Sequence, residues 1–320
     1  MSWQDFGWRS EVLPREPLEE ETRAGLALPR TLRPVAGDDV RQRAVFDPAL
    51  KHLARAYRGA DPVFDDPART RAWAVARRAA MDAVLEGVAR SPWVDALVLR
   101  GSVLLARWCG EAAREPGDLD FVVVPHTWAV DDGRTGEMLE GIAAAADGRA
   151  GLRASGAVRE GIWTYDRVPG LRMVLPWEVP GLPAGQVQLD FVFNERLPAP
   201  PEPVELPGGA AVRAASPALS LAWKLLWLVS DMHPQGKDLY DAVLLAERYA
   251  LPYPLLEEVF RSAPERPLPN PEVSLADIAT YGSVGHEWRH FAAEYPGLAG
   301  SEEHWAARLL TALEPTFRGR

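Results

Sequence analysis

Cysteine is nearly absent from this 320-residue chain. Cys109 is the only one, so the sequence excludes both an intramolecular disulfide framework and a zinc cluster built on paired cysteines. Scarce cysteine is also typical of proteins in a reducing compartment, and we therefore expect a cytoplasmic protein.

Long hydrophobic runs are missing as well. No apolar stretch approaches the roughly 18 to 20 residues that a membrane-spanning helix needs. The first residues, MSWQDFGWRSEVLPREPLEEE, carry acidic side chains and lack the apolar segment of a signal peptide. With 47% hydrophobic and 25% charged residues, the composition is typical of a globular protein, and we expect it to be soluble with no membrane partner.

The chain also lacks an excess of positive charge. It has 35 Lys and Arg residues against 45 Asp and Glu residues, a formal net charge of −10. This balance argues against a uniformly basic surface for nucleic acid, although a local basic groove is compatible with an acidic protein. The GxSxG elbow of serine hydrolases and the P-loop of nucleotide hydrolases are both absent.

The most informative stretch runs from Val98 to Val124, VLRGSVLLARWCGEAAREPGDLDFVVV. It predicts a strand, a Gly-Ser turn, a short helix, a loop and a second strand. Residues two apart in a strand project from the same face, so Asp118 and Asp120 point the same way. Adjacent carboxylates repel each other unless a cation or a shared proton lies between them. This pattern indicates a metal site.

A Gly-Ser pair, Gly101 and Ser102, precedes the predicted short helix. The amino end of a helix offers free amides and a positive dipole to a phosphate group, and glycine lets a ligand approach the backbone closely. The alternative is a plain turn in which the serine caps the helix.

A third acid, Asp190, lies in the alternating run VQLDFVFN. If this run forms a strand beside the one that carries Asp118, three carboxylates converge at one sheet surface. Hard cations prefer oxygen ligands, which favours Mg²⁺, with Mn²⁺ as an alternative. The open alternative is that each aspartate is a strand-end or turn residue facing water.

The remaining pattern predicts an α/β (α+β) fold, with a mixed β-sheet core, flanking helices and a C-terminal helical domain. The Pro- and Gly-rich segment 197–209 predicts a linker, and we divide the chain into residues 1–92 (an arm and helices packed on the core), 93–205 (the core) and 206–320 (the helical domain). We expect helices over 48–58, 67–90, 102–109, 136–146, 216–230, 237–249, 253–261 and 302–313. We expect strands over 96–100, 118–124, 161–166, 171–175 and 186–194.

These motifs carry a resemblance. LRGSVLLARWCG…DLDFVV, followed by VQLDFVF, resembles the nucleotidyltransferase signature of a Gly-Ser helix start, an acid pair and a later strand acid. SLAWKLLWLVSDMHPQGKDLYDAVLLAE is similar to the helical half of AbiEii-type nucleotidyltransferases, the toxins of bacterial abortive-infection and toxin–antitoxin systems. The matching positions there are Lys224, Lys237, Asp238, Tyr240 and Asp241. The resemblance covers about residues 95–250, and the fifteen residues between Ser102 and Asp118 are more than the family usually has.

The resemblance implies a Mg²⁺-dependent transferase that moves a nucleoside monophosphate from a nucleoside triphosphate (NTP) to an acceptor hydroxyl, with residues 93–205 as the nucleotidyltransferase core. It further implies an acceptor such as the 3′ end of a tRNA, and an antitoxin protein as partner. The expected catalytic and metal-binding residues are Asp118, Asp120 and Asp190. The expected nucleotide-binding residues are Gly101, Ser102, Lys224, Asp238 and Asp241, with Asp241 preferred over Asp238 as a contact. A basic lip for RNA would consist of Arg100, Arg107, Arg114 and Lys237.

Two alternatives stay open. The same fold could be a nucleotide-binding module without turnover. The sequence His286-Glu287-Trp288-Arg289-His290 also matches the HExxH pattern of zinc metallopeptidases, with His304 as a third ligand. The alternative interpretation of this second motif is a polar surface helix without a metal.

Overall fold

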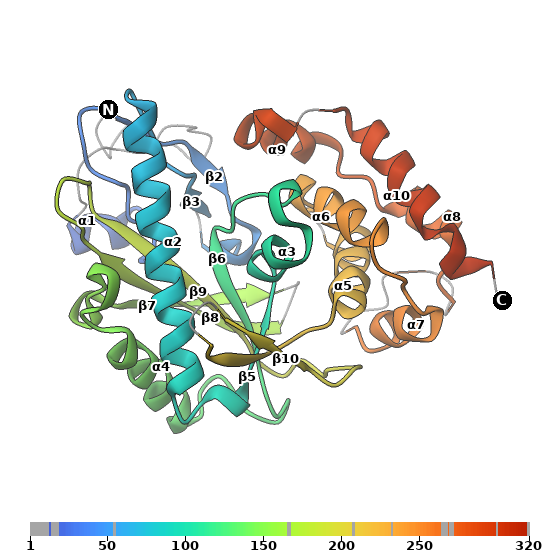
Figure 1. Cartoon of the computed structure of the whole chain (residues 1–320), viewed down its shortest axis with the longest axis horizontal. Helices are drawn as coiled ribbons and strands as arrows, with labels where there is room; N and C mark the ends of the chain where they lie inside the picture. Colours follow the sequence, from blue (N-terminus) through green and yellow to red (C-terminus); the bar gives the residue numbers. More distant parts are fainter. Residues whose placement is uncertain are drawn as a thin grey trace.

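The computed structural model describes residues 13, 19–53, 56–164, 168–206, 209–231, 233–263, 268, 272–298 and 300–318. Across these residues, helices cover a mixed β-sheet, and a group of C-terminal helices packs beside it (Figure 1). The expected fold class, α/β (α+β) around a mixed sheet, is therefore confirmed. None of the described helices is long and apolar enough to cross a membrane.

The described strands and α-helices have the following bounds. The strands are β1 (Val40–Arg41), β2 (Ala44–Phe46), β3 (Tyr57–Gly59), β4 (Val63–Phe64), β5 (Leu97–Arg100), β6 (Asp118–Val123), β7 (Val158–Thr164), β8 (Val168–Trp177), β9 (Gly185–Val192), β10 (Glu202–Glu205) and β11 (Ala211–Ala214). The helices are α1 (Glu20–Gly25), α2 (Pro67–Arg90), α3 (Ser102–Cys109), α4 (Gly133–Ala146), α5 (Pro217–Ser230), α6 (Gly236–Ala246), α7 (Tyr253–Arg261), α8 (Leu275–Tyr281), α9 (Trp288–Glu294) and α10 (Glu302–Phe317).

The main sheet has the strand order β10-β11-β5-β6-β9-β8-β7 in the described part of the chain. Strand β6 pairs antiparallel with β5 and parallel with β9. The register places Asp120 directly opposite Asp190, and Asp118 opposite Gln188. The predicted adjacency of the two acid-bearing strands is thus confirmed.

Helices α2 and α4 cover one face of the sheet. Helix α2 begins after Asp66, whose carboxylate accepts a hydrogen bond from the Ala68 amide (2.8 Å), and it ends before Pro92, as predicted. Alternate residues of β6, Leu119 and Phe121, are fully buried against these helices. Since side chains alternate along a strand, the aspartates between them lie on the opposite face.

The opposite face of the sheet meets the C-terminal helices. Val98 of β5 and Val122 of β6 share a second hydrophobic cluster with α5 and α6. Helix α5 is buried along most of its length, and α6 packs against both α5 and α10. The carboxylate-bearing face of the sheet therefore looks toward α5 and α6.

The predicted helix over residues 48–58 is wrong. Residues Pro48–Leu50 form a single 3₁₀ turn, and β2 pairs with β3 as a hairpin, with Phe46 opposite Tyr57; residues 54 and 55 lie outside the described residues. Leu50 and Ala56 are buried against Ile162 of β7. Tertiary packing on the sheet edge overrides the local helical pattern here.

The predicted linker, residues 197–209, is only partly a linker. Residues 202–205 form β10, which pairs with β11, and β11 pairs in parallel with β5. Proline is tolerated there because β10 is an edge strand. The domain boundary near residue 205 stays a prediction. Residues 1–12 of the predicted arm, 165–166 of a predicted strand and 207–208 lie outside the described residues.

We predict that Phe121→Ala destabilises the protein by about 3–5 kcal/mol, because it removes a large side chain from a close-packed core. Phe121 is fully buried and stacks on Phe191 with ring centroids 5.6 Å apart. Urea denaturation followed by circular dichroism measures the change. Val75→Ala, at a position 69% exposed on α2, should change stability by less than about 0.5 kcal/mol; equal losses in both variants would contradict the assigned core.

Candidate active site

A cavity lies where the sheet, helices α5 and α6 and the N-terminal hairpin meet. Its floor is formed by the ends of β5, β6 and β9 and the start of α3. The residues that line it are Phe46, Asp47, Pro48, Ala49, Lys51, Arg58, Arg100, Gly101, Ser102, Arg114, Asp118, Asp120, Ile162, Trp163, Arg172, Gln188, Asp190, Val192, Lys224, Trp227, Asp231, Gln235, Lys237 and Asp238.

Three carboxylates converge in this cavity, as the sequence predicts. Asp118, Asp120 and Asp190 each present an oxygen within 4.8 Å of the others. Among the described residues, this is the one group of three or more potential ligand side chains close enough to share a metal ion. An all-oxygen donor set suits a hard cation such as Mg²⁺ or Mn²⁺.

The three carboxylates titrate differently because their surroundings differ. Burial, together with the charges of Asp118 and Asp190, raises the pKa of Asp120 to about 7. Burial also acts on Asp118, but the positive charges of Lys237 and Arg114 outweigh it and hold the pKa of Asp118 below its usual value. Mutual repulsion is therefore concentrated on Asp120, and a divalent cation would relieve it.

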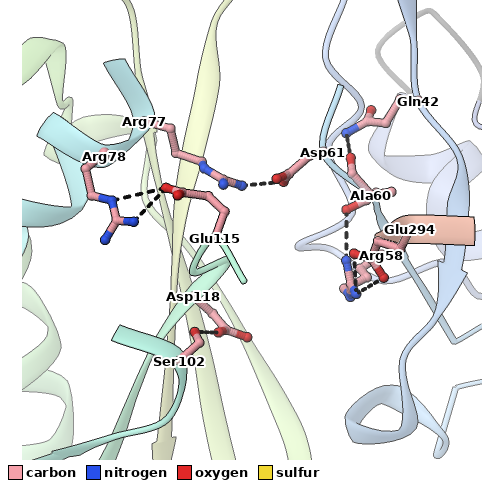
Figure 2. A network of polar contacts seen from close by, with 11 residues as sticks. Gln42, Arg58, Ala60, Asp61, Arg77, Arg78, Ser102, Glu115, Asp118 and Glu294 are labelled. Atoms are coloured by element: carbon pink, nitrogen blue, oxygen red, sulfur yellow. Dashed lines mark hydrogen bonds and ion pairs between the residues drawn. The ribbon is translucent and has the colours of Figure 1, made fainter. Parts of the chain in front are cut away.

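The start of α3 lies directly against the carboxylate cluster. Ser102 donates a hydrogen bond from Oγ to Oδ1 of Asp118 (3.3 Å; Figure 2). Gly101 has φ +83°, a conformation that only glycine adopts without strain. A Cβ atom at Gly101 would lie 2.2 Å from Oδ2 of Asp120. The Gly-Ser pair thus lets the backbone approach the carboxylates, which goes beyond a simple helix cap.

Asp190 is held by an arginine that the sequence analysis missed. Arg172 of β8, only 3% exposed, donates to both oxygens of Asp190, each at 2.8 Å. The same guanidinium binds Asp47 from the N-terminal hairpin. Burial raises the pKa of Asp190, although the charge of Arg172 opposes the rise. Strand pairing of Arg172 opposite Asp190 creates the contact, and no local motif signals it.

Lys224 lines the cavity but is not free. Its ammonium lies 2.6 Å from Oδ1 of Asp238 and 3.2 Å from Oδ2 of Asp241. Burial would lower the pKa of Lys224, yet these two carboxylates outweigh it and raise the pKa. The lysine therefore stays charged, with two ion-pair partners already in place.

Asp241, which we expected to contact the nucleotide, does not line the cavity. It is fully buried and accepts hydrogen bonds from Nε (3.1 Å) and Nη2 (2.9 Å) of Arg114. Burial is outweighed by Arg114 and Lys224, so the pKa of Asp241 is lowered. Asp241 is therefore in a position to orient these two cations behind the cavity wall, while Asp238 reaches the cavity itself.

The four residues of the predicted basic lip occupy different environments, and their contact with RNA stays a prediction. Arg100 and Arg114 line the cavity but are buried and paired with Glu195 and Asp241, and Arg107 does not line it. Lys237 differs from them. It lines the cavity and makes no hydrogen bond or ion pair with any described residue, which leaves its ammonium available for an anionic ligand.

One wall of the cavity is aromatic. Two cations lie near the Trp227 ring, with Cζ of Arg100 5.3 Å and Nζ of Lys224 4.9 Å from its centroid. Phe46 and Trp163 line the same cavity from the hairpin and from β7. Aromatic faces of this kind can stack on a nucleobase.

The HExxH motif does not form a metal site in the described structure. His286 and Glu287 belong to a 3₁₀ turn, and His290 lies on the short helix α9. His286 is exposed, and none of these histidines belongs to a group of three ligand side chains among the described residues. The alternative interpretation of the motif, as a polar surface segment, fits this geometry.

Fold and cavity together place the protein in the class of α/β proteins with a carboxylate cluster suited to a divalent cation at the start of a helix. Residues 83–312 match the model of a family described as nucleotidyl transferase AbiEii toxin, type IV toxin–antitoxin system. This match spans well over half of the chain, which therefore belongs to the AbiEii nucleotidyltransferase family. The resemblance inferred from the motifs is confirmed and extends further along the chain.

One solved structure is similar to the chain at low identity. It is the crystal structure of an antigenic nucleotidyltransferase-like protein from Paracoccidioides brasiliensis, with 16% identity, a TM-score of 0.35, and coverage of 68% of this chain and 84% of that one. No curated protein matches the chain.

We predict that Gly101→Ala weakens Mg²⁺ binding at least tenfold, because the added methyl group displaces the Asp120 carboxylate. Gly110→Ala is a matched control at the other end of α3. It also has positive φ, +56°, but its Cβ would meet no atom within 4 Å. Backbone strain should destabilise each variant by about 1–3 kcal/mol, whereas only Gly101→Ala should also lose Mg²⁺ affinity. Titration calorimetry with Mg²⁺ measures this affinity. Equal Mg²⁺ affinities in the two variants would refute the proposed contact.

The pKa of Asp120 predicts how stability depends on pH. Without metal, the folded state holds a proton up to about pH 7, whereas the unfolded chain releases it near pH 4. Stability from this group is therefore present at low pH and is lost as the pH rises through 7. Asp120→Asn should remove this loss, so the stability of the metal-free variant relative to the parent protein should increase by about 2 kcal/mol between pH 5.5 and pH 8.

Thermal melts in EDTA at pH 5.5 and pH 8 measure this difference. Asp131→Asn, which changes an exposed carboxylate outside the cavity, should leave the pH dependence as in the parent protein. If the difference in stability between the metal-free parent protein and Asp120→Asn is the same at both pH values, the raised pKa of Asp120 is contradicted.

Proposed function

We propose that this protein is a Mg²⁺-dependent nucleotidyltransferase that moves a nucleoside monophosphate from an NTP to an acceptor hydroxyl. The observation that carries the proposal is the convergence of Asp118, Asp120 and Asp190 at the Gly101–Ser102 helix start, in a member of a nucleotidyltransferase family. Mn²⁺ would fit the same oxygen ligands.

The residues would divide the work as follows. Asp118, Asp120 and Asp190 would hold one or two cations, which would supply positive charge to stabilise an in-line displacement. The amides at Gly101 and Ser102 would receive oxygens of the β- and γ-phosphates. Lys237, with no partner among the described residues, would neutralise phosphate charge.

Lys224 and the two carboxylates on α6 would act differently from the expectation. Asp238 and Asp241 hold the Lys224 ammonium beside Trp227. Lys224 would bind phosphate only as part of this fixed group, with Asp241 as an orienting residue. Asp238 lines the cavity and would accept a hydrogen bond from the nucleotide sugar.

The transfer step would balance in the following way. The acceptor oxygen forms a bond to the α-phosphorus, the bond from that phosphorus to the bridging oxygen breaks, and pyrophosphate leaves. Asp190 would receive the acceptor proton as the general base of the step. Pairing with Arg172 would fix its orientation during the step.

Family membership supports a biological role as a toxin of a type IV toxin–antitoxin system. We therefore propose an antitoxin protein as partner, the tRNA 3′ end as an acceptor and the cytoplasm as location. The second candidate, a nucleotide-binding module without turnover, lacks a specific supporting observation, because all three carboxylates are present.

We predict that the purified protein transfers labelled nucleotide from at least one NTP to bulk tRNA with Mg²⁺, and that Asp118→Ala lowers the rate at least a hundredfold. Asp131→Ala should retain the parent rate, because Asp131 is an exposed carboxylate outside the cavity. Thin-layer and gel analysis of the labelled RNA measures both. If Asp118→Ala still transfers nucleotide at the parent rate, the metal-site assignment is wrong. If the protein binds NTP with Mg²⁺ but transfers no nucleotide, the binding module is favoured.

A further inference from the structure

A second cavity adjoins the first. The two share Arg58, Arg114, Asp118, Gln188 and Lys237 as lining residues. The second cavity extends from this shared wall toward α2 and the N-terminal segment, where Arg77 lines it. Several of its residues precede residue 83, where the family match begins, so the family model does not cover them.

Positive charge dominates the second cavity. Five cationic side chains line it against three carboxylates. The cationic residues are Arg33, Arg58, Arg77, Arg114 and Lys237, and the acidic residues are Asp61, Asp118 and Glu294. In a chain with a net charge of −10, this local excess favours an anionic ligand.

Arg77 is the unusual member of this set. It is only 4% exposed, and its Nη1 binds Asp61 (Figure 2). Its Nε and Nη2 atoms are buried and have no hydrogen-bond partner among the described residues. An unsatisfied buried donor costs about 1–3 kcal/mol. A guanidinium presents two such donors as a fork that matches a phosphate or carboxylate group.

The cavity also presents an unsatisfied acceptor. Oε1 of Gln186, on β9, is buried and has no hydrogen-bond partner in the described part of the chain. A ligand that satisfies both Arg77 and Gln186 must combine an oxyanion with a hydroxyl or amino donor. A phosphate attached to a sugar and base has this combination.

We propose that the second cavity binds the acceptor strand of the transfer reaction through a backbone phosphate on Arg77, with Gln186 accepting a hydrogen bond from the adjoining nucleotide. The proposal rests on the function proposed above. Because both cavities include Asp118 and Lys237, a nucleotide in the second cavity would present its terminal hydroxyl toward the carboxylate cluster. A protein acceptor, without a phosphate, would leave Arg77 unsatisfied.

Direct binding tests the phosphate contact without requiring transfer. Titration calorimetry with inorganic phosphate in EDTA measures anion binding without Mg²⁺, and the Arg77 variants show how much of this binding belongs to the second cavity. We expect Arg77→Gln to bind phosphate at least tenfold more weakly than the parent protein. Arg78→Gln is the control, since Arg78 is the next residue on α2 but pairs with Glu115 at 2.8 Å and does not line the cavity.

Circular dichroism shows whether Arg77→Gln folds. If it does not, Arg77→Lys and Gln186→Leu test the proposal in its place. Arg77→Lys keeps the charge without the fork and should bind phosphate about fivefold more weakly. Gln186→Leu should bind inorganic phosphate normally but lower kcat/KM for the acceptor strand. No phosphate binding by the parent protein, or equal binding by a folded Arg77 variant, would overturn the proposal.

A transfer assay identifies which substrate supplies the phosphate. The acceptors are short oligoribonucleotides with a 3′-hydroxyl, compared with the same strands carrying a neutral methylphosphonate as the last linkage. The parent protein should favour the charged strand at least tenfold in kcat/KM, and Arg77→Gln should abolish this preference while the KM for NTP stays unchanged. A raised KM for NTP, or an equal loss with both acceptors, would overturn the proposal.

The two proposals fail differently. If the parent protein binds phosphate through Arg77 but transfers nucleotide to no acceptor, both the transferase function and the acceptor assignment are wrong, and only an anion site remains. If transfer depends on Asp118 but not on Arg77 with either acceptor, the function stands and the second cavity is not the acceptor site.

Discussion

Repulsion among three closely spaced carboxylates is the constraint around which the cavity is built. The pairing of β6 with β9 sets Asp120 opposite Asp190, so the sheet itself forces the negative charges together. Desolvation strengthens their repulsion, which is why the pKa of Asp120 rises to about 7. The protein tolerates this cost through nearby cations, and a divalent ion at the proposed site would relieve the remaining repulsion.

The compensating cations come from different parts of the chain. Arg172 lies on β8, Lys237 on α6 and Arg114 in the loop before β6. Each influences the carboxylates only because the C-terminal helices and the sheet meet at one cavity. Binding chemistry and folding are coupled here, since Arg172 links β8 to β9 and to the N-terminal hairpin, and Arg114 links the loop before β6 to α6.

The N-terminal segment, outside the family match, adds to this arrangement. Asp47 binds the same guanidinium that holds Asp190, and Arg58 pairs with Glu294 on α9 at 3.1 Å. The hairpin that carries both residues packs on the edge strand β7. It thereby connects the sheet core with the C-terminal helices and forms a wall of both cavities.

Sequence patterns alone determined the elements with strong periodicity and the acids on adjacent strands. Helix α2 and the alternation around Asp118 were predictable because spacing and capping are local. Local spacing could not reveal Arg172, Arg77 or the burial of Asp241, since each gains its partners from residues far away in the chain. Only the tertiary structure decided which charges are paired, because pairing depends on distance in space, whereas spacing in the sequence fixes only which face a side chain occupies.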